Sequence, residues 1–114
     1  MSSDQRDIVD GTLVVRTAKN GDTHIISLRG ELDLANASTA EAALEASFGE
    51  NGSQVVVDMS ELEFIDSTGI ALLVAALGRN DDGDRVRFVL SPSPAVARVL
   101  EVTGLTERLP LADS

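Results

Sequence analysis

The order of apolar and polar positions divides the chain into alternating extended and helical stretches. Four stretches have the spacing of β-strands: residues 12–17, 24–29, 54–58 and 85–90. The first two flank Asn20-Gly21, a strong signal for a tight hairpin turn, so we expect them to pair antiparallel. The third is a continuous apolar run, which is typical of a strand buried in the centre of a sheet.

Three further stretches repeat apolar residues at the spacing of an α-helix. The positions that define them are Ala40, Leu44 and Phe48; Ile70, Leu73, Val74 and Leu77; and Val96, Val99 and Leu100. The first helix is expected to begin near Ser38, where Ser-Thr-Ala-Glu has the spacing of a capping box. The third follows an N-cap at Ser93 with Pro94 as its first residue, and Gly104 ends it.

The resulting order is ββαβαβα followed by a short tail. Successive β-α-β units require right-handed crossovers and parallel pairing after the opening hairpin. We therefore expect an α/β fold: a small mixed β-sheet, with an N-terminal antiparallel hairpin and then parallel strands, and helices packed against it. Because the chain has no internal repeat or long linker, residues 11–114 are expected to form a single domain, and residues 1–10 a flexible N-terminal leader.

Charge and composition narrow the classes of function. The 114 residues carry 19 Asp and Glu against 9 Lys and Arg, a net charge of −10, which repels nucleic-acid phosphates and anionic lipid. We therefore expect neither a nucleic-acid nor a membrane partner. Cysteine is absent, which excludes disulfides and thiolate metal sites. The polar N-terminus does not resemble a signal peptide, and no apolar run approaches the ~18 residues of a membrane span, so a cytoplasmic protein is expected.

The segment Asp66-Ser67-Thr68-Gly69 stands out because four small or polar residues separate an apolar pair from an apolar helix. This order places Ser67 and Thr68 at a helix N-terminus. One interpretation is structural, since such residues cap the N–H groups of a first helical turn. The other is functional: a hydroxyl beside those N–H groups is placed to carry a phosphate, and Gly69 would let a partner's backbone approach closely.

At these positions the chain resembles a known family. Asp66-Ser67-Thr68-Gly69 follows Phe64-Ile65 and is preceded by Val55-Val56-Val57-Asp58-Met59-Ser60. This arrangement is similar to the central motif of the STAS domain, and most similar to that of the bacterial anti-sigma factor antagonists. Gly30-Glu31-Leu32-Asp33 matches the second signature of the family, between the second strand and the first helix. The resemblance covers about residues 11–110 and agrees with the ββαβαβα order.

The resemblance implies a partner switch in transcription regulation rather than an enzyme. The unphosphorylated antagonist would bind a serine-kinase anti-sigma factor and so release a sigma factor. The kinase would supply ATP and Mg²⁺ and phosphorylate Ser67, with Thr68 the less favoured hydroxyl, and a serine phosphatase would reverse the step. The chain itself would need no cofactor or metal and would be a monomer when free. The partner-binding residues implied are Asp33, Asp66, Ser67, Thr68 and Gly69.

Local roles remain open for the two acidic residues of this set, since Asp33 and Asp66 also suit helix caps. Asp58 resembles the acceptor of a phospho-receiver domain, but the chain has no acidic pair after its first strand, and its only lysine lies in the hairpin turn. A serine hydrolase would have to use His24, the sole histidine, and no Gly-x-Ser-x-Gly elbow is present. A STAS scaffold or accessory subunit of another complex, working without phosphorylation, is the alternative within the fold.

Overall fold

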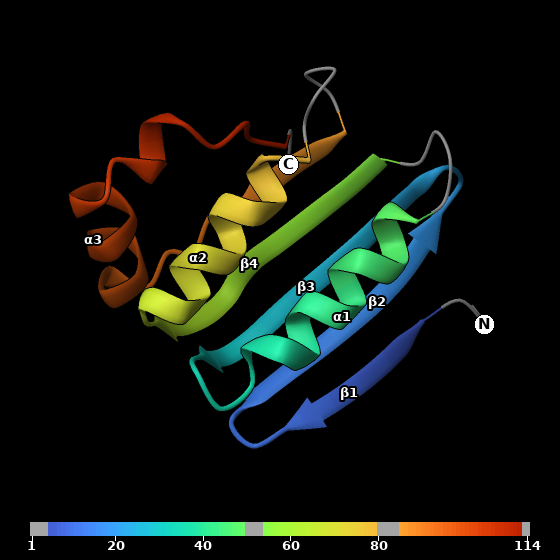
Figure 1. Cartoon of the computed structure of the whole chain (residues 1–114), viewed down its shortest axis with the longest axis horizontal. Helices are drawn as coiled ribbons and strands as arrows, with labels where there is room; N and C mark the ends of the chain where they lie inside the picture. Colours follow the sequence, from blue (N-terminus) through green and yellow to red (C-terminus); the bar gives the residue numbers. More distant parts are fainter. Residues whose placement is uncertain (1–4, 50–53, 80–84, 113–114) are drawn as a thin grey trace.

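The computed structural model describes residues 5–49, 54–79 and 85–112. These residues form a five-stranded sheet whose strands lie side by side in the order of the sequence (Figure 1). The strands are β1 (Arg6–Asp10), β2 (Leu13–Asn20), β3 (Thr23–Leu32), β4 (Gln54–Ile65) and β5 (Val86–Val89). The helices are α1 (Ala37–Phe48), α2 (Ser67–Leu77) and α3 (Pro94–Val102), and a 3-10 turn, η1 (Leu105–Glu107), follows α3.

The sheet is antiparallel over β1 to β3 and parallel over β3 to β5, so the predicted mixed α/β fold is confirmed. The predicted hairpin joins β2 to β3, but its turn lies one residue later than the Asn-Gly pair indicates. Asn20 still pairs with Thr23, and the two-residue loop is Gly21-Asp22, with φ of 63° at Gly21. Glycine takes this left-handed backbone without a Cβ clash, so it occupies the first loop position.

The expected flexible leader is wrong over its second half, because residues 6–10 form strand β1 at the edge of the sheet. A second two-residue loop, Gly11-Thr12, turns β1 onto β2, with φ of 60° at Gly11. This strand gives a weak sequence signal because it is short and its two apolar residues are adjacent, so apolar and polar residues do not alternate along it. Residues 1–4 lie outside the described residues.

Two further boundaries differ from the sequence prediction. α1 begins after Asn36, so Ser38 lies inside the helix and the predicted capping box does not form. β4 continues past residue 58 to Ile65 because its later residues pair with the end of β3. Ser93 precedes α3 and Pro94 is its first residue, as predicted.

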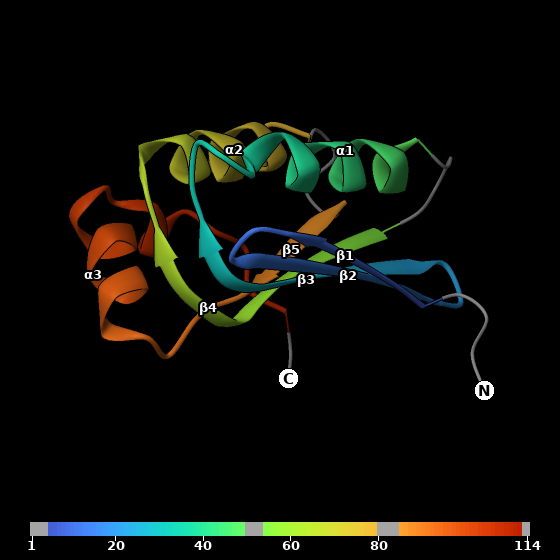
Figure 2. The ribbon, with the colours of Figure 1, turned by 90° about the horizontal axis from the view of Figure 1, so that it is seen from below.

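α1 and α2 cover one face of the sheet, and α3 lies apart from them beside β4 (Figures 1 and 2). Side chains alternate along the strands, and those that point under the two helices form an almost entirely aliphatic core. The buried strand residues include Leu13, Val15, Ile26, Leu28, Val55, Val57, Met59, Val86 and Phe88. Within the described ranges, no helix is both long enough and apolar enough to span a bilayer.

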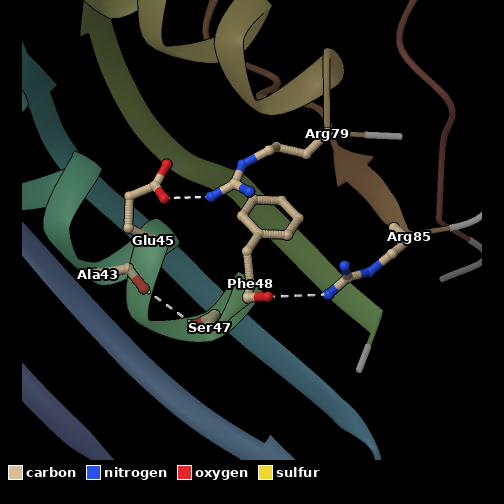
Figure 3. A network of polar contacts seen from close by, with 6 residues as sticks. All are labelled: Ala43, Glu45, Ser47, Phe48, Arg79 and Arg85. Atoms are coloured by element: carbon tan, nitrogen blue, oxygen red, sulfur yellow. Dashed lines mark hydrogen bonds and ion pairs between the residues drawn. The ribbon is translucent and has the colours of Figure 1, made fainter. Parts of the chain in front are cut away.

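Phe48 connects the last turn of α1 to the segments that follow α2 and precede β5 (Figure 3). The guanidinium of Arg79 lies 5.0 Å from the Phe48 ring centroid, and that of Arg85 lies 5.7 Å away. Arg79 also forms an ion pair with Glu45, and Arg85 donates a 3.2 Å hydrogen bond to the backbone oxygen of Phe48. Cations over an aromatic ring stabilise by about 0.5–1 kcal/mol each at exposed positions. These contacts join α1 and α2 at the end of α2 that is remote from Ser67.

Candidate functional site

The predicted site residues meet at the carboxyl ends of two neighbouring parallel strands. Leu32 ends β3 and Ile65 ends β4, and these two residues are partners in the register of the sheet. Asp33 and Asp66 follow these two residues directly, so both lie at the same end of the sheet, where β3 and β4 finish. The backbone N–H of Asp66 donates a 3.2 Å hydrogen bond to the carbonyl oxygen of Leu32, which joins the two strand ends.

Asp66 is the N-cap of α2 and connects this helix to the neighbouring loop. One carboxylate oxygen, Oδ1, accepts hydrogen bonds from the N–H groups of Thr68, at 2.9 Å, and Gly69, at 3.1 Å. The other oxygen, Oδ2, accepts a 3.2 Å hydrogen bond from the N–H of Leu34 in the loop between β3 and α1. A negative charge at a helix N-terminus is also favoured by the helix dipole. A single carboxylate therefore fixes both segments of the site.

Ser67 is the first residue of α2, as predicted, and its side chain is exposed. Thr68 follows it and is half-buried, so Ser67 is the more accessible of the two hydroxyl residues. The structure changes one part of the prediction: the N–H groups of Thr68 and Gly69 already bond to Asp66. A phosphate on Ser67 would have to displace this carboxylate before it used those two donors.

Gly69 is buried against the two strand ends rather than open to a partner. A Cβ at this position would lie 2.5 Å from Cγ1 of Ile65 and 3.0 Å from Cγ of Leu32, both of which are core residues. The missing side chain therefore makes room for the packing of α2 on the sheet. The expected approach of a partner's backbone to Gly69 has no support in this geometry.

Asp33 has a local structural role as well as its place at the site. Its Oδ1 accepts a 3.0 Å hydrogen bond from the N–H of Ala35, and its carbonyl oxygen accepts from the N–H groups of Asn36 and Ala37. The buried side chain of Asn36 completes the turn, since its Oδ1 accepts from the N–H of Asp33 at 3.0 Å and its Nδ2 donates to the carbonyl of Glu31 at 2.9 Å. The loop that carries Asp33 is thus held by its own polar groups.

Leu34 is a site residue that the sequence analysis missed. Its side chain is 77% exposed although its backbone N–H is bonded to Asp66, so a large apolar group is held in solvent on the loop that Asp66 joins to the start of α2. It lines one end of a groove of about 330 Å³ between α1 and α2. Thr68 and Leu72 line the same groove from α2. The available signal was a leucine directly after the Gly-Glu-Leu-Asp signature, in the segment between a predicted strand and a predicted helix.

The residues that would support the rival interpretations lie elsewhere. His24 is near the start of β3, and at 3.3 Å per residue this is about 26 Å from the end of the strand that carries the site. Asp58 points to the sheet face that α1 and α2 leave uncovered, and its Oδ1 accepts a 2.9 Å hydrogen bond from the N–H of Ser60. Neither group reaches Ser67, so the geometry supports neither a Ser-His pair nor a common site with Asp58.

Comparisons with known proteins agree with the motifs. A family model described as "Mlab, STAS domain" matches residues 15–112. The anti-sigma-B factor antagonist of Staphylococcus epidermidis is 27% identical over 95 residues, which cover 83% of this chain and 88% of that protein. The crystal structure of an anti-sigma factor antagonist from Mycobacterium paratuberculosis has a TM-score of 0.79 and 25% identity, over 90% of this chain and 86% of that one. The phosphorylated form of the Bacillus cell fate determinant SpoIIAA is alike in fold, with a TM-score of 0.64 and 22% identity over 88% and 92% of the two chains.

The matched region begins within β2 and ends beyond η1, so it includes the parallel part of the sheet, all three helices and the site around Asp66 and Ser67. The resemblance of the two motifs is therefore confirmed over nearly the whole chain. The chain belongs to the STAS domain family, and the relatives compared with it are anti-sigma factor antagonists.

Proposed function

We propose that this chain is an anti-sigma factor antagonist that binds a serine-kinase anti-sigma factor and is released from it by phosphorylation of Ser67. The observation that carries the proposal is the exposure of Ser67 at the first position of a helix whose start is fixed by Asp66. A kinase needs an accessible hydroxyl that it can align with the phosphate to be transferred, because phosphoryl transfer depends mainly on positioning and charge stabilisation. The chain contributes the hydroxyl, and ATP and Mg²⁺ belong to the kinase.

The surface proposed for the kinase consists of Ser67, Thr68 and the exposed Leu34. Apolar residues that reach into a partner commonly dominate the affinity of such an interface, while the polar residues around them set its specificity. Leu34 is suited to this role because its backbone is held by Asp66, so little conformational entropy is lost on binding. In this proposal Asp33 and Asp66 position the surface and add negative charge to it.

Phosphorylation would act outward, on the partner, rather than inward on the fold. A phosphoserine adds about −1.5 to −2 charges and three acceptor oxygens. Asp66 already holds the nearest helix N–H donors and is itself negative, so the phosphate would remain in solvent beside another carboxylate. A bound kinase would then enclose the phosphate and the Asp66 carboxylate side by side at the interface. Like charges brought together in this way cost several kcal/mol, enough to separate the antagonist from the kinase. A serine phosphatase would restore the binding form, and all of these steps are proposed to take place in the bacterial cytoplasm.

The proposal is tested by incubating the protein with each candidate anti-sigma kinase of its genome, ATP and Mg²⁺, and mapping the added phosphate by peptide mass spectrometry. We expect label on Ser67 with one kinase and none in Ser67→Ala. Thr68→Val is the matched control, because it removes the neighbouring hydroxyl while keeping the shape, and it should still be labelled. Label that persists in Ser67→Ala and disappears in Thr68→Val would transfer the role to Thr68.

The charge mechanism needs a separate pair of variants. Ser67→Asp and Ser67→Asn are nearly equal in size and differ in charge, so calorimetric titration against the kinase separates the two effects. We expect Ser67→Asn to bind like the parent and Ser67→Asp to bind at least about tenfold more weakly. Equal weakening by both variants would show that size rather than charge releases the partner.

The alternative is a scaffold or accessory subunit of another complex that uses the same surface without phosphorylation. The description of the matching family model does not itself require an antagonist of a sigma-factor system. Affinity purification with the parent protein and with Leu34→Ser as the surface control distinguishes the two functions. Recovery of a non-kinase assembly that Leu34→Ser loses, together with no phosphate on Ser67 in cells, would favour the scaffold.

A further inference from the structure

The outer edge of β1 is an exposed strand edge that the proposed function does not use. Val9 is 70% exposed and Ile8 is 44% exposed, on opposite faces of the strand. β1 is the first strand of the sheet, and within the described ranges no strand lies on its outer side. Such an edge presents unpaired N–H and C=O groups to which another strand can pair, and β1 contains no proline or lysine, although three of its five residues are charged.

The hairpin register determines which backbone groups of β1 face outward. Asp10 and Leu13 flank the two-residue loop, so they form the hydrogen-bonded pair that closes the turn. Bonded and non-bonded pairs alternate along an antiparallel ladder, so Ile8 and Arg6 also direct their N–H and C=O groups toward β2. The groups of Asp7 and Val9 therefore point away from the sheet and are the ones a further strand would bind.

This alternation allows few registers for a second copy of the chain. In an antiparallel, two-fold pairing centred on Ile8, Asp7 of one copy lies opposite Val9 of the other, and their outward groups form the bonded pairs. Arg6 of each copy then lies opposite Asp10 of the other copy, so opposite charges face each other at two symmetric positions. The two Ile8 side chains face each other in a non-bonded pair, where side chains approach most closely.

The neighbouring registers with the same hydrogen-bond parity are less favourable. Centring the pair on Asp7 places two carboxylates directly opposite each other, which is destabilising. Centring it on Val9 removes the pairing of Arg6 with Asp10, so no opposite charges face each other across the two strands. Of these three registers, the one centred on Ile8 is therefore favoured by charge, since it places each Arg6 opposite an Asp10.

The helix-side face of β1 supports the same arrangement. Ile8 lines a groove of about 670 Å³ between β1 and α1, and the α1 residues that line it include Ala42 and Ala46, whose small side chains leave the space open. Thr39 of α1 donates a 2.6 Å hydrogen bond to Oδ2 of Asp10, which fixes that carboxylate at the edge. In the pairing centred on Ile8, the grooves of the two copies meet across the two-fold axis.

We infer that two copies of this chain associate through β1 into a continuous ten-stranded sheet, with Arg6 of each copy paired to Asp10 of the other. This inference differs from the sequence-based expectation of a monomer when free, which stays untested. Closed two-fold dimers of this isologous kind are the commonest oligomers. Because the two β1 strands run antiparallel, the two Ser67 sites would lie at opposite ends of the dimer and remain accessible.

Charge reversal at one edge tests the inference by sedimentation velocity over a concentration series. Arg6→Asp alone and Asp10→Arg alone place like charges opposite each other at both symmetric positions, so each should weaken dimerisation on the order of tenfold. A mixture of the two variants restores opposite charges at both positions and should form heterodimers. The double variant Arg6→Asp/Asp10→Arg also restores opposite charges and should form homodimers. Heterodimer formation also shows that both single variants are folded.

A second variant tests the backbone pairing. Val9→Pro removes an N–H that points outward, so it should abolish the dimer and leave the β1–β2 ladder intact, with an unchanged circular dichroism spectrum. A parent protein that remains monomeric at about 1 mM, the weak end of the affinity scale, would overturn the inference. A dimer that persists in Val9→Pro, or a mixture that associates no better than its components, would place the interface elsewhere.

Discussion

Gly69 offers a sharp test of how α2 is seated on the sheet, because the usual effect of a glycine-to-alanine change should be reversed there. Alanine in place of glycine within a helix normally stabilises by about 1 kcal/mol. At residue 69, however, the added Cβ would lie 2.5 Å from Cγ1 and 3.1 Å from Cδ1 of Ile65, and 3.0 Å from Cγ of Leu32. These distances are shorter than van der Waals contact, so the neighbours or the helix must move.

The structure limits how this clash can be relieved. Ile65 is 2% exposed and Leu32 is fully buried, and both lie at strand ends paired with each other, so neither side chain has free space. Overpacking of a core costs about 1–3 kcal/mol. After subtraction of the helix-propensity gain, Gly69→Ala should lower the free energy of unfolding by about 1 kcal/mol, which corresponds to a decrease in Tm of about 4 °C for a chain of this size.

Gly78→Ala is the matched control because it makes the same change at the other end of the same helix. Gly78 has φ of −65°, and a Cβ there would meet the backbone oxygens of Ala75 and Val74 at ordinary distances of 3.4 and 3.7 Å. It should therefore stabilise by about 0.4–1 kcal/mol. Urea unfolding followed by far-UV circular dichroism is the assay, since the chain has no Trp or Tyr for fluorescence.

A Gly69→Ala variant as stable as the parent, or more stable, would refute the packing argument. The background Ile65→Ala gives an independent check. It removes the two Ile65 atoms that clash and leaves only Cγ of Leu32 close to the new Cβ, so Gly69→Ala should be less destabilising there than in the parent, and the double-mutant cycle should show a coupling of the opposite sign to the single change. A coupling of zero would show that the two residues do not compete for the same space.

Three further outcomes are expected. Asp66→Ala should destabilise by about 1–2 kcal/mol through loss of an N-cap, and Asp66→Asn by less, because the amide oxygen still accepts; urea unfolding of the pair measures the difference. Phe48→Ala should cost about 3–5 kcal/mol, and Arg79→Ala under about 1 kcal/mol, since only the ring is buried. The side-chain hydrogen bond from Arg16 lowers the pKa of Asp7. The stability that this pair contributes is therefore present above the ordinary pKa of an aspartate and is lost as the pH falls through the lowered pKa. In Arg16→Gln, an NMR titration should show the pKa of Asp7 rise toward its ordinary value.

The fold was predictable from sequence wherever a single element carried a strong local pattern. The helix at Ser67 follows from a polar N-cap and an apolar stripe, and the β2–β3 hairpin follows from alternation around a glycine turn. β1 and the later half of β4 were missed for a different reason. Both are held in the sheet by their pairing with a neighbouring strand, and such pairing is a property of the assembled fold rather than of the local sequence.

The site was predictable in its chemistry and less so in its geometry. The motif identifies Asp66 and Ser67 together at a helix start, and this is where they lie. The contact of Asp66 with Leu34 spans 32 residues of sequence and depends on the parallel register of β3 and β4, which no local pattern encodes. Gly69 illustrates the same limit, since the sequence shows a missing side chain but does not show which neighbours occupy its place.

The parallel pairing of β3 and β4 also determines when the site comes into being as the chain folds. The β1–β2–β3 hairpins close short loops and can form early, whereas the two segments of the site meet only after the α1 crossover has closed and β4 has docked. A partly folded chain therefore carries Ser67 and Leu34 without the arrangement that joins them. Under the proposed function, competence to engage the partner would therefore be coupled to completion of folding.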